Sequence, residues 1–214
     1  MMEALTIMSC QKIKTNPKYT AKEQASITSQ NEIDSILSTL EKTPYQQLDT
    51  AYLNYSHPHR KFTQELQNRD YYKVYGYQLN TKIVGNYRIK DFLAKDDYYK
   101  TYLKNPFPEF EMYWLIDKKV LYMMLELISQ LEEEGYDPDG FHIRNSHRHP
   151  KLNTDGNGAS YSQHMFGKAI DIGIDDIDQD GDTTQTDKMI VYEMLQDIVS
   201  NKGGLGLYPG TMNL

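Results

Sequence analysis

Apolar side chains recur every three or four positions between residues 117 and 136. This spacing places them on one stripe and predicts a helix that packs on a core; the stripe consists of Val120, Leu121, Met124, Leu125, Ile128 and Leu131. Gly135 follows where a helix C-cap is expected. Similar spacing predicts a helix over residues 32–42, closed by Pro44, and another helix is expected over residues 188–202.

A period of two marks the expected strands in the second half of the chain. Isoleucines alternate with small or acidic residues over residues 169–174, so they can enter a core together while Asp171 stands on the opposite face. Residues 141–144 predict the strand that leads to Ser146 and Arg148. The resulting order of helix, strand, loop, strand, acidic loop and helix indicates an α+β domain with a small antiparallel sheet and packed helices.

The first half of the chain has a weaker and different pattern. Residues 1–30 are polar and are expected to form a flexible tail. Residues 31–109 join the first helix to tyrosine-rich runs at 71–77 and 82–89, divided by Asn80-Thr81, which predict strands of an N-terminal β-rich extension. Residues 110–214 hold the α+β domain. The chain has 214 residues, 39% of them hydrophobic and 25% charged, which is ordinary for a globular protein.

Charge and cysteine content narrow the expected partners. The net charge is −7 and Lys and Arg form no stripe, which argues against nucleic acid because phosphate contacts need clustered cations. No apolar run is long enough to span a membrane. The single cysteine, Cys10, excludes an intramolecular disulfide, and residues 1–10 do not form a complete secretory signal. A small molecule, peptide or glycan is the expected partner.

His164 and Asp171 are the first candidates for chemistry. Gly167 and Ala169 lie between them and are small enough to leave space for a ligand or an ion. A neutral imidazole together with a carboxylate is a mixed ligand set that suits zinc. The pair therefore predicts two of the three protein ligands of a zinc site.

Two short segments carry a family resemblance. Ser146-His147-Arg148 and Ser162-Gln163-His164, with Asp171 seven positions after His164, resemble the signature of the zinc D-alanyl-D-alanine carboxypeptidases and dipeptidases, which is Ser-x-Arg, then Ser-x-His-x6-Asp, then a later His. The resemblance covers roughly residues 110–214.

The resemblance implies a zinc peptidase-like domain that hydrolyses peptide bonds of peptidoglycan stem peptides. His164 and Asp171 would bind zinc, and Arg148 would grip or polarise the substrate. Ser146 and Ser162 are candidates for orienting the substrate or the imidazole. Because peptidoglycan lies outside the cytoplasm, an extracytoplasmic location is expected.

The sequence departs from the family pattern at its end. In such enzymes the third zinc ligand, a histidine, and the general base follow a Gly-Gly-x-Gly-x-Tyr-Pro segment, whereas here residues 203–209 are followed only by residues 210–214. We therefore expect a domain that lacks its last strand, an inactive form, or a substitute ligand. His149 is the nearest substitute; His57 and His59 look like surface residues, and His147 takes a position that is usually aromatic and packs.

Residues 176–187 form a second candidate site. Asp176, Asp178, Asp180, Thr184 and Asp187 occupy positions 1, 3, 5, 9 and 12 of a loop with glycine at position 6, as in EF-hand calcium loops. Position 12 is aspartate rather than the usual glutamate, which predicts weak calcium binding. The alternative is a solvated acidic turn in which Asp187 caps the helix that follows.

Two functions from different classes remain open at this point. One is a zinc metallopeptidase of the cell wall. The other is a non-catalytic member of the same fold that binds wall peptides or calcium. Likeness of fold alone does not decide between them.

Overall fold

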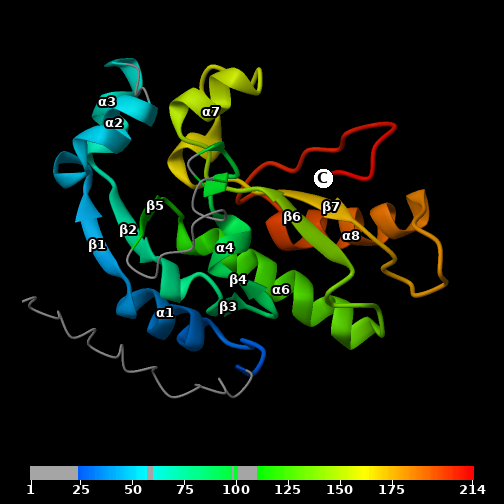
Figure 1. Cartoon of the computed structure of the whole chain (residues 1–214). Helices are drawn as coiled ribbons and strands as arrows, with labels where there is room; N and C mark the ends of the chain where they lie inside the picture. The colour runs from blue at the N-terminus through cyan, green and yellow to red at the C-terminus, as the bar shows by residue number, and fades with distance from the viewer. Residues whose placement is uncertain (1–23, 57–59, 98, 101–109) are drawn as a thin grey trace, which may run out of the picture.

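The computed structural model describes residues 24–56, 60–97, 99–100 and 110–214, and its fold is α+β, as predicted (Figure 1). The helices are α1 (Gln30–Thr39), α2 (Thr50–Ser56), α3 (Arg60–Gln67), α4 (Ile89–Phe92), α6 (Lys118–Glu134), α7 (Pro150–Asp155) and α8 (Gln185–Val199), with 3-10 turns η1 (Tyr45–Gln47), η2 (Gly76–Gln78) and η3 (Gln163–Phe166). The strands are β1 (Glu41–Pro44), β2 (Asp70–Tyr75), β3 (Lys82–Val84), β4 (Tyr87–Arg88), β5 (Glu111–Trp114), β6 (Phe141–Asn145) and β7 (Asp171–Ile174).

The predicted helix over residues 117–136 is confirmed as α6. Asp117 caps its start by accepting a hydrogen bond from the Lys119 N–H, and Gly135 closes it in the left-handed conformation, with φ 83°. The first helix ends at Thr39, three residues earlier than expected, because Leu40 is extended and leads directly into β1.

The three-stranded sheet has the order β1-β2-β5, and all its pairs are antiparallel. The run at 71–77 therefore lies in β2, which pairs with β1 and β5, whereas the run at 82–89 forms β3 and β4, a separate two-stranded ribbon. The turn η2 separates the two, and the Gln78 side chain closes it by accepting a hydrogen bond from the Tyr75 N–H at 2.9 Å. β5 lies beyond residue 109, so this sheet joins the expected extension to the expected domain.

β6 and β7 form a third antiparallel sheet, of two strands, as their sequence pattern predicted. Ile172 and Ile174 enter the core, with 5% and 2% of their surface exposed. The helices α6 and α8 pack against each other, and α8 also contacts β7, behind which it lies in the view of Figure 1. Residues 212–214 pair with the free edge of β7, through Ile174 N–H to Met212 O at 2.8 Å and a reciprocal pair between Ile172 and Leu214 at 3.0 Å.

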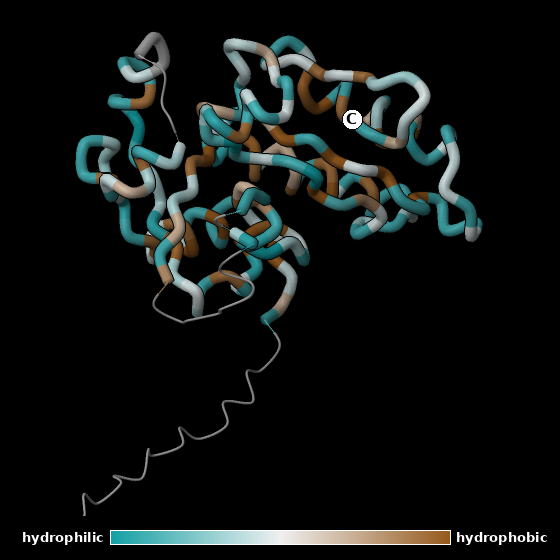
Figure 2. Tube along the Cα trace, turned by 45° about the horizontal axis from the view of Figure 1, so that its top comes forward, coloured by the Kyte–Doolittle hydropathy of each residue, from teal (hydrophilic) through white to brown (hydrophobic). Residues whose placement is uncertain are grey.

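Two hydrophobic clusters organise the interior, where Figure 2 shows the brown, hydrophobic stretches gathered. The main core runs from Ile27 to Leu214 and includes α1, α6, α8, β6 and β7. Ile27 is buried and pairs with Gly85, and Ser29 caps α1, so residues 27–30 belong to the fold rather than to the expected flexible tail. Residues 1–23 lie outside the described residues. No helix among the described residues is long and apolar enough to cross a membrane.

The second cluster explains how the first half of the chain supports the later motifs. Met165 and Phe166 of η3 are buried together with side chains from η1, α2, α3, β2 and β5. The turn that carries His164 therefore rests on a core built largely by residues 45–71 and 113–115.

Candidate functional site

The structure brings the predicted zinc residues together where β6 and β7 meet. Asp171 is the first residue of β7 and lies opposite Asn145, the last residue of β6. His164 lies in η3, and Arg148 lies in the short loop between β6 and α7. The antiparallel pairing of two strands thus places segments about twenty residues apart around one carboxylate.

His164 is oriented through both ring nitrogens. Its Nδ1 lies 2.7 Å from the carbonyl oxygen of Ser146, and its Nε2 lies 3.1 Å from Asp171 Oδ1. A carbonyl oxygen only accepts hydrogen bonds, so Nδ1 must carry a hydrogen and donate it. Nε2 and Oδ1 then face each other as two acceptors, unless a cation lies between them. That cation can be a proton or a metal ion.

Asp171 uses its second oxygen for other partners. The guanidinium of Arg148 forms an ion pair with Oδ2, and Asn145 Nδ2 donates to the same oxygen at 3.2 Å. Burial alone would raise the pKa of Asp171, but the hydrogen bond and charge of His164, the charge of Arg148 and the hydrogen bond from Asn145 together hold that pKa below its usual value. The carboxylate is therefore held ionised.

The loop that carries Arg148 is also fixed through its backbone. The Arg148 N–H donates to the carbonyl oxygen of His164 at 3.1 Å. The two motifs that the sequence placed sixteen residues apart are thus tied by one backbone hydrogen bond and by the contact of His164 with Ser146. The structure brings Arg148, His164 and Asp171 into one cluster.

The two predicted serines contribute differently. Ser146 is buried and orients His164 through its carbonyl oxygen, while its hydroxyl has no partner among the described residues. Ser162 is buried just before η3, and its carbonyl oxygen accepts from the Met165 N–H at 3.1 Å.

The sequence suggested that Gly167 leaves space for a ligand, but the structure shows a different reason for glycine at this position. It has φ +67°, and a Cβ there would lie 2.5 Å from the carbonyl oxygen of Leu115. The Asp117 N–H also donates to the Gly167 carbonyl at 2.8 Å. Glycine is required here because η3 packs directly on the backbone that follows β5.

No third ligand joins His164 and Asp171 among the described residues. Within the described ranges, three His, Cys, Asp or Glu side chains come close enough to share a metal ion only in the acidic loop. His142 is exposed and pairs with Asp175 at 2.9 Å, while His149 pairs with Asp96 in the interior. His147 is buried, as its expected packing role requires. His57, His59 and Cys10 lie outside the described residues.

The C-terminal segment runs antiparallel to β7 and towards the site. Asn213 lies opposite Gly173, and Leu214 exchanges both backbone hydrogen bonds with Ile172. In this register the position directly after Leu214 lies opposite Asp171. Opposed residues of an antiparallel pair place their side chains on the same face.

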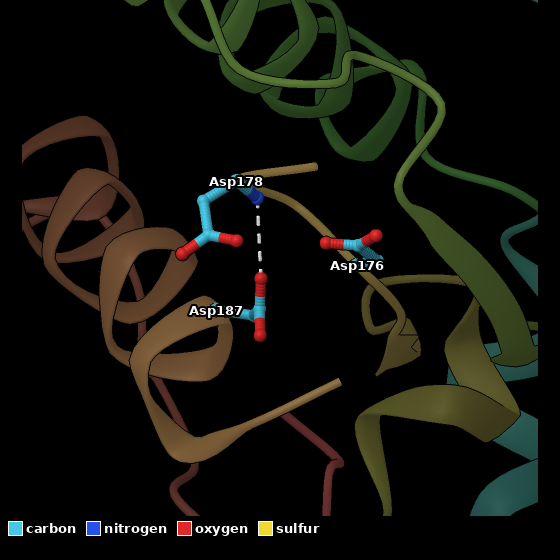
Figure 3. Close-up of side chains that lie close together, drawn as sticks. All are labelled: Asp176, Asp178 and Asp187. Atoms are coloured by element: carbon cyan, nitrogen blue, oxygen red, sulfur yellow. Dashed lines mark hydrogen bonds between the residues drawn. The ribbon is translucent and has the colours of Figure 1, made fainter. Parts of the chain in front are cut away.

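The acidic loop brings three of its five predicted ligands together. Carboxylate oxygens of Asp176, Asp178 and Asp187 all lie within 4.8 Å of one another (Figure 3). Asp180 and Thr184 are not in this cluster: Asp180 Oδ1 accepts from the Asp182 N–H at 2.9 Å, and Thr184 serves as the N-cap of α8.

Asp187 is fully buried, and its oxygens have partners within the loop. Oδ1 accepts from the backbone N–H groups of Ile177 at 2.8 Å and Asp178 at 3.2 Å, and Oδ2 accepts from the Thr184 N–H at 2.7 Å. Asp187 thus forms a capping box with Thr184 and also fastens the loop, which supports the capping role that the sequence offered as the alternative.

Comparisons with protein-family models, with curated proteins and with solved structures give no match to this chain. The sequence did not single out Asn145, which is part of the site, or Asp96, which pairs with His149 outside it. Asn145 directly precedes the Ser-x-Arg segment, and its place directly after a predicted strand was the signal that could have found it. For Asp96 the sequence offers no signal, because it lies 53 residues from its partner His149.

Proposed function

We propose that this protein is a zinc metallopeptidase that hydrolyses peptide bonds of peptidoglycan stem peptides, outside the cytoplasm. The observation that carries the proposal is the approach of His164 Nε2 and Asp171 Oδ1 to 3.1 Å, with Nδ1 of the histidine committed to a carbonyl oxygen. Two acceptors held face to face form a place for a cation. The family resemblance supplies the substrate class.

The pair fits zinc in chemistry and in size. Zinc bonds to imidazole nitrogen and carboxylate oxygen of ~2.0–2.2 Å at a tetrahedral angle separate the two ligand atoms by about 3.4 Å. The observed 3.1 Å is close to that separation. The hydrogen bond of His164 to Ser146 is the kind of outer contact that fixes the tautomer of a zinc-binding histidine.

When bound, zinc would polarise the scissile carbonyl and lower the pKa of a bound water towards ~7. The residues of the chain would orient the reactants. Arg148 presents a guanidinium beside the ligand carboxylate, where it can stabilise a developing oxyanion or the terminal carboxylate of the peptide. Asn145 holds Asp171 so that Oδ1 stays turned towards His164. No general base is assigned.

Zinc content measured by elemental analysis, after dialysis against trace zinc, tests the proposal. We expect His164→Ala and Asp171→Ala to lose the zinc that the unmutated chain retains. His142→Ala, at an exposed histidine outside the site, is the matched control and should keep it. Equal zinc in all four proteins would refute the site. Arg148→Ala should keep the metal and lose turnover of D-alanyl-D-alanine peptides.

An added ligand provides a second test of the same site. A single histidine appended after Leu214 would stand opposite Asp171 in the observed register. A four-ligand zinc site is worth about 10–16 kcal/mol, or roughly 3 kcal/mol per ligand, so we expect zinc affinity to rise on the order of a hundredfold. An appended alanine is the control. No difference between the two would count against the geometry of the site.

The second candidate function is calcium binding by the acidic loop, favoured by the convergence of Asp176, Asp178 and Asp187. Here the protein would be a non-catalytic wall-peptide or calcium binder of the same fold. The variant Asp178→Ala should lower the thermal midpoint more in the presence of calcium than in its absence, because one carboxylate of the cluster is lost. Asp182→Ala, in the same loop but outside the cluster, is the control. A thermal midpoint of the unmutated protein that does not respond to calcium would eliminate this function.

A further inference from the structure

A buried hydrogen bond links the first half of the chain to the loop of Arg148. His149 Nε2 hydrogen-bonds to Asp96 Oδ2, and only 3% and 8% of the two residues' surfaces are exposed. The partners are 53 residues apart. Neither residue contacts His164 or Asp171 in any hydrogen bond of the described chain, so the contact lies outside the proposed zinc site.

The tautomer of His149 is fixed by its second nitrogen. The backbone N–H of Leu152 donates to Nδ1 at 3.2 Å, which makes His149 the N-cap of α7. Because Nδ1 accepts, Nε2 must carry the hydrogen that is donated to Asp96. The imidazole therefore has one role at each end: it caps the helix and it ties that helix to Asp96.

Asp96 is itself held firmly. Its Oδ1 accepts from the Tyr99 N–H at 2.9 Å, and its carboxylate also accepts from the hydroxyl of Tyr55 in α2. The rings of Tyr55 and His149 lie 5.2 Å apart, edge to face. Burial would raise the pKa of Asp96, but the hydrogen bonds from His149, Tyr99 and Tyr55 outweigh it and lower that pKa.

The contact ends one residue from Arg148. Only residues 146–149 connect β6 to α7. In this short loop the carbonyl of Ser146 orients His164, the N–H of Arg148 reaches the carbonyl of His164, and the next residue is tied to Asp96. A loop of four residues with its far end fastened leaves the Arg148 backbone little freedom.

We propose that Asp96 is a positioning residue, which fixes Arg148 on Asp171 by anchoring His149 at the start of α7. The inference goes beyond the proposed function, because the geometry of Arg148 and His164 matters for any ligand of this site. A buried pair of polar side chains is weak evidence for stability, since well-packed apolar residues are often as stable in its place. What it adds is a directional constraint on one loop.

His149→Asn tests this directly. Asparagine is as good a helix N-cap as any residue, so α7 keeps its cap, but the shorter side chain cannot reach Asp96. The measurement is 15N NMR of the guanidinium of Arg148 and the imidazole of His164, with backbone amide spectra as the check of folding. We expect the resolved, slowly exchanging Nη–H signals of Arg148 to be lost and the His164 Nε2 signal to shift.

Three further variants make the result decisive. Asp96→Ala should reproduce the losses, and Asp96→Asn, which keeps an oxygen acceptor for His149, should restore the signals at least in part. Asp34→Ala is the control: it removes a carboxylate that ties α1 to Tyr122 and Lys118 of α6, remote from the loop. It should change neither signal.

Unchanged Arg148 and His164 signals in folded His149→Asn protein would overturn the proposal, and so would the same losses in Asp34→Ala. If Asp96→Ala does not fold, His149→Asn and Asp96→Asn still decide. The measurement needs neither zinc nor a peptide. A chain that binds no zinc would therefore refute the proposed function and leave this test intact.

Discussion

His147 offers the sharpest prediction about stability. It is 2% exposed, and neither ring nitrogen has a hydrogen-bond partner among the described residues. Its ring lies against that of Tyr71, with centroids 5.9 Å apart and an interplanar angle of 73°. Such a site accepts the neutral imidazole and disfavours the charged one. We expect His147→Phe to remove a pH dependence that the unmutated protein shows.

The sign and size of this pH dependence follow from the pKa of His147. Burial, with smaller contributions from His149 and His164, lowers the pKa of His147 from 6.5 to about 3. Between these values the unfolded chain binds a proton that the folded chain does not, so the stabilisation is complete above about pH 6.5 and is lost as pH falls. At 1.36 kcal/mol per pH unit, the loss between about pH 7.5 and about pH 5 is about 2 kcal/mol.

Urea unfolding at several pH values between 5 and 7.5 measures this effect. The unmutated protein should lose about 2 kcal/mol more than His147→Phe over that interval. Other titrating groups are common to both proteins and cancel in the difference. His147→Leu is the control for ring packing: its stability at neutral pH will differ, but its pH dependence should match that of His147→Phe. Parallel pH profiles for all three proteins would refute the reasoning.

Two further predictions concern a backbone contact and the acidic loop. Gly167→Ala should lower the free energy of unfolding by about 3 kcal/mol or more, because φ is +67° and the new Cβ would lie 2.5 Å from the Leu115 carbonyl oxygen. Gly135→Ala is the control: φ is +83° but the space is open, so it should cost about 1 kcal/mol, and urea denaturation compares the two variants. Asp187→Ala should lower the free energy of unfolding by about 3–5 kcal/mol, because it leaves backbone N–H groups of the loop unpaired. Asp187→Asn should cost about half as much, because one oxygen acceptor remains. Thermal and urea unfolding without calcium checks both values.

The sequence was a good guide where local periodicity and local chemistry agree. The stripe of α6 and the glycine that ends it give both bounds of that helix to within a few residues. The alternation around Asp171 correctly placed this residue on β7 with its isoleucine neighbours in the core. His164 and Arg148 could be grouped with Asp171 because a short spacing and two small motifs connect them.

Pairings over long distances in the chain could not be predicted. Nothing in the run at 71–77 shows that it pairs with residues 41–44 and 111–114 rather than with its neighbour at 82–89. The sequence also does not indicate the hydrogen bond between Asp96 and His149, since each residue alone looks like an ordinary polar side chain. Gly167 suggested free space, yet a close backbone approach from Leu115 explains it. These features depend on which segments meet in space.

The partners of Asp171 leave one of its oxygens for a cation, either a proton or a metal ion, beside His164 Nε2. Here Arg148 and Asn145 occupy the other oxygen, so that Oδ1 is free and directed at Nε2. Residues 212–214 pair with the edge of β7 that faces away from β6. A carboxylate that is held ionised and directed at an imidazole nitrogen fits the zinc site that we propose. The zinc content of the His164→Ala and Asp171→Ala variants decides between the two cations.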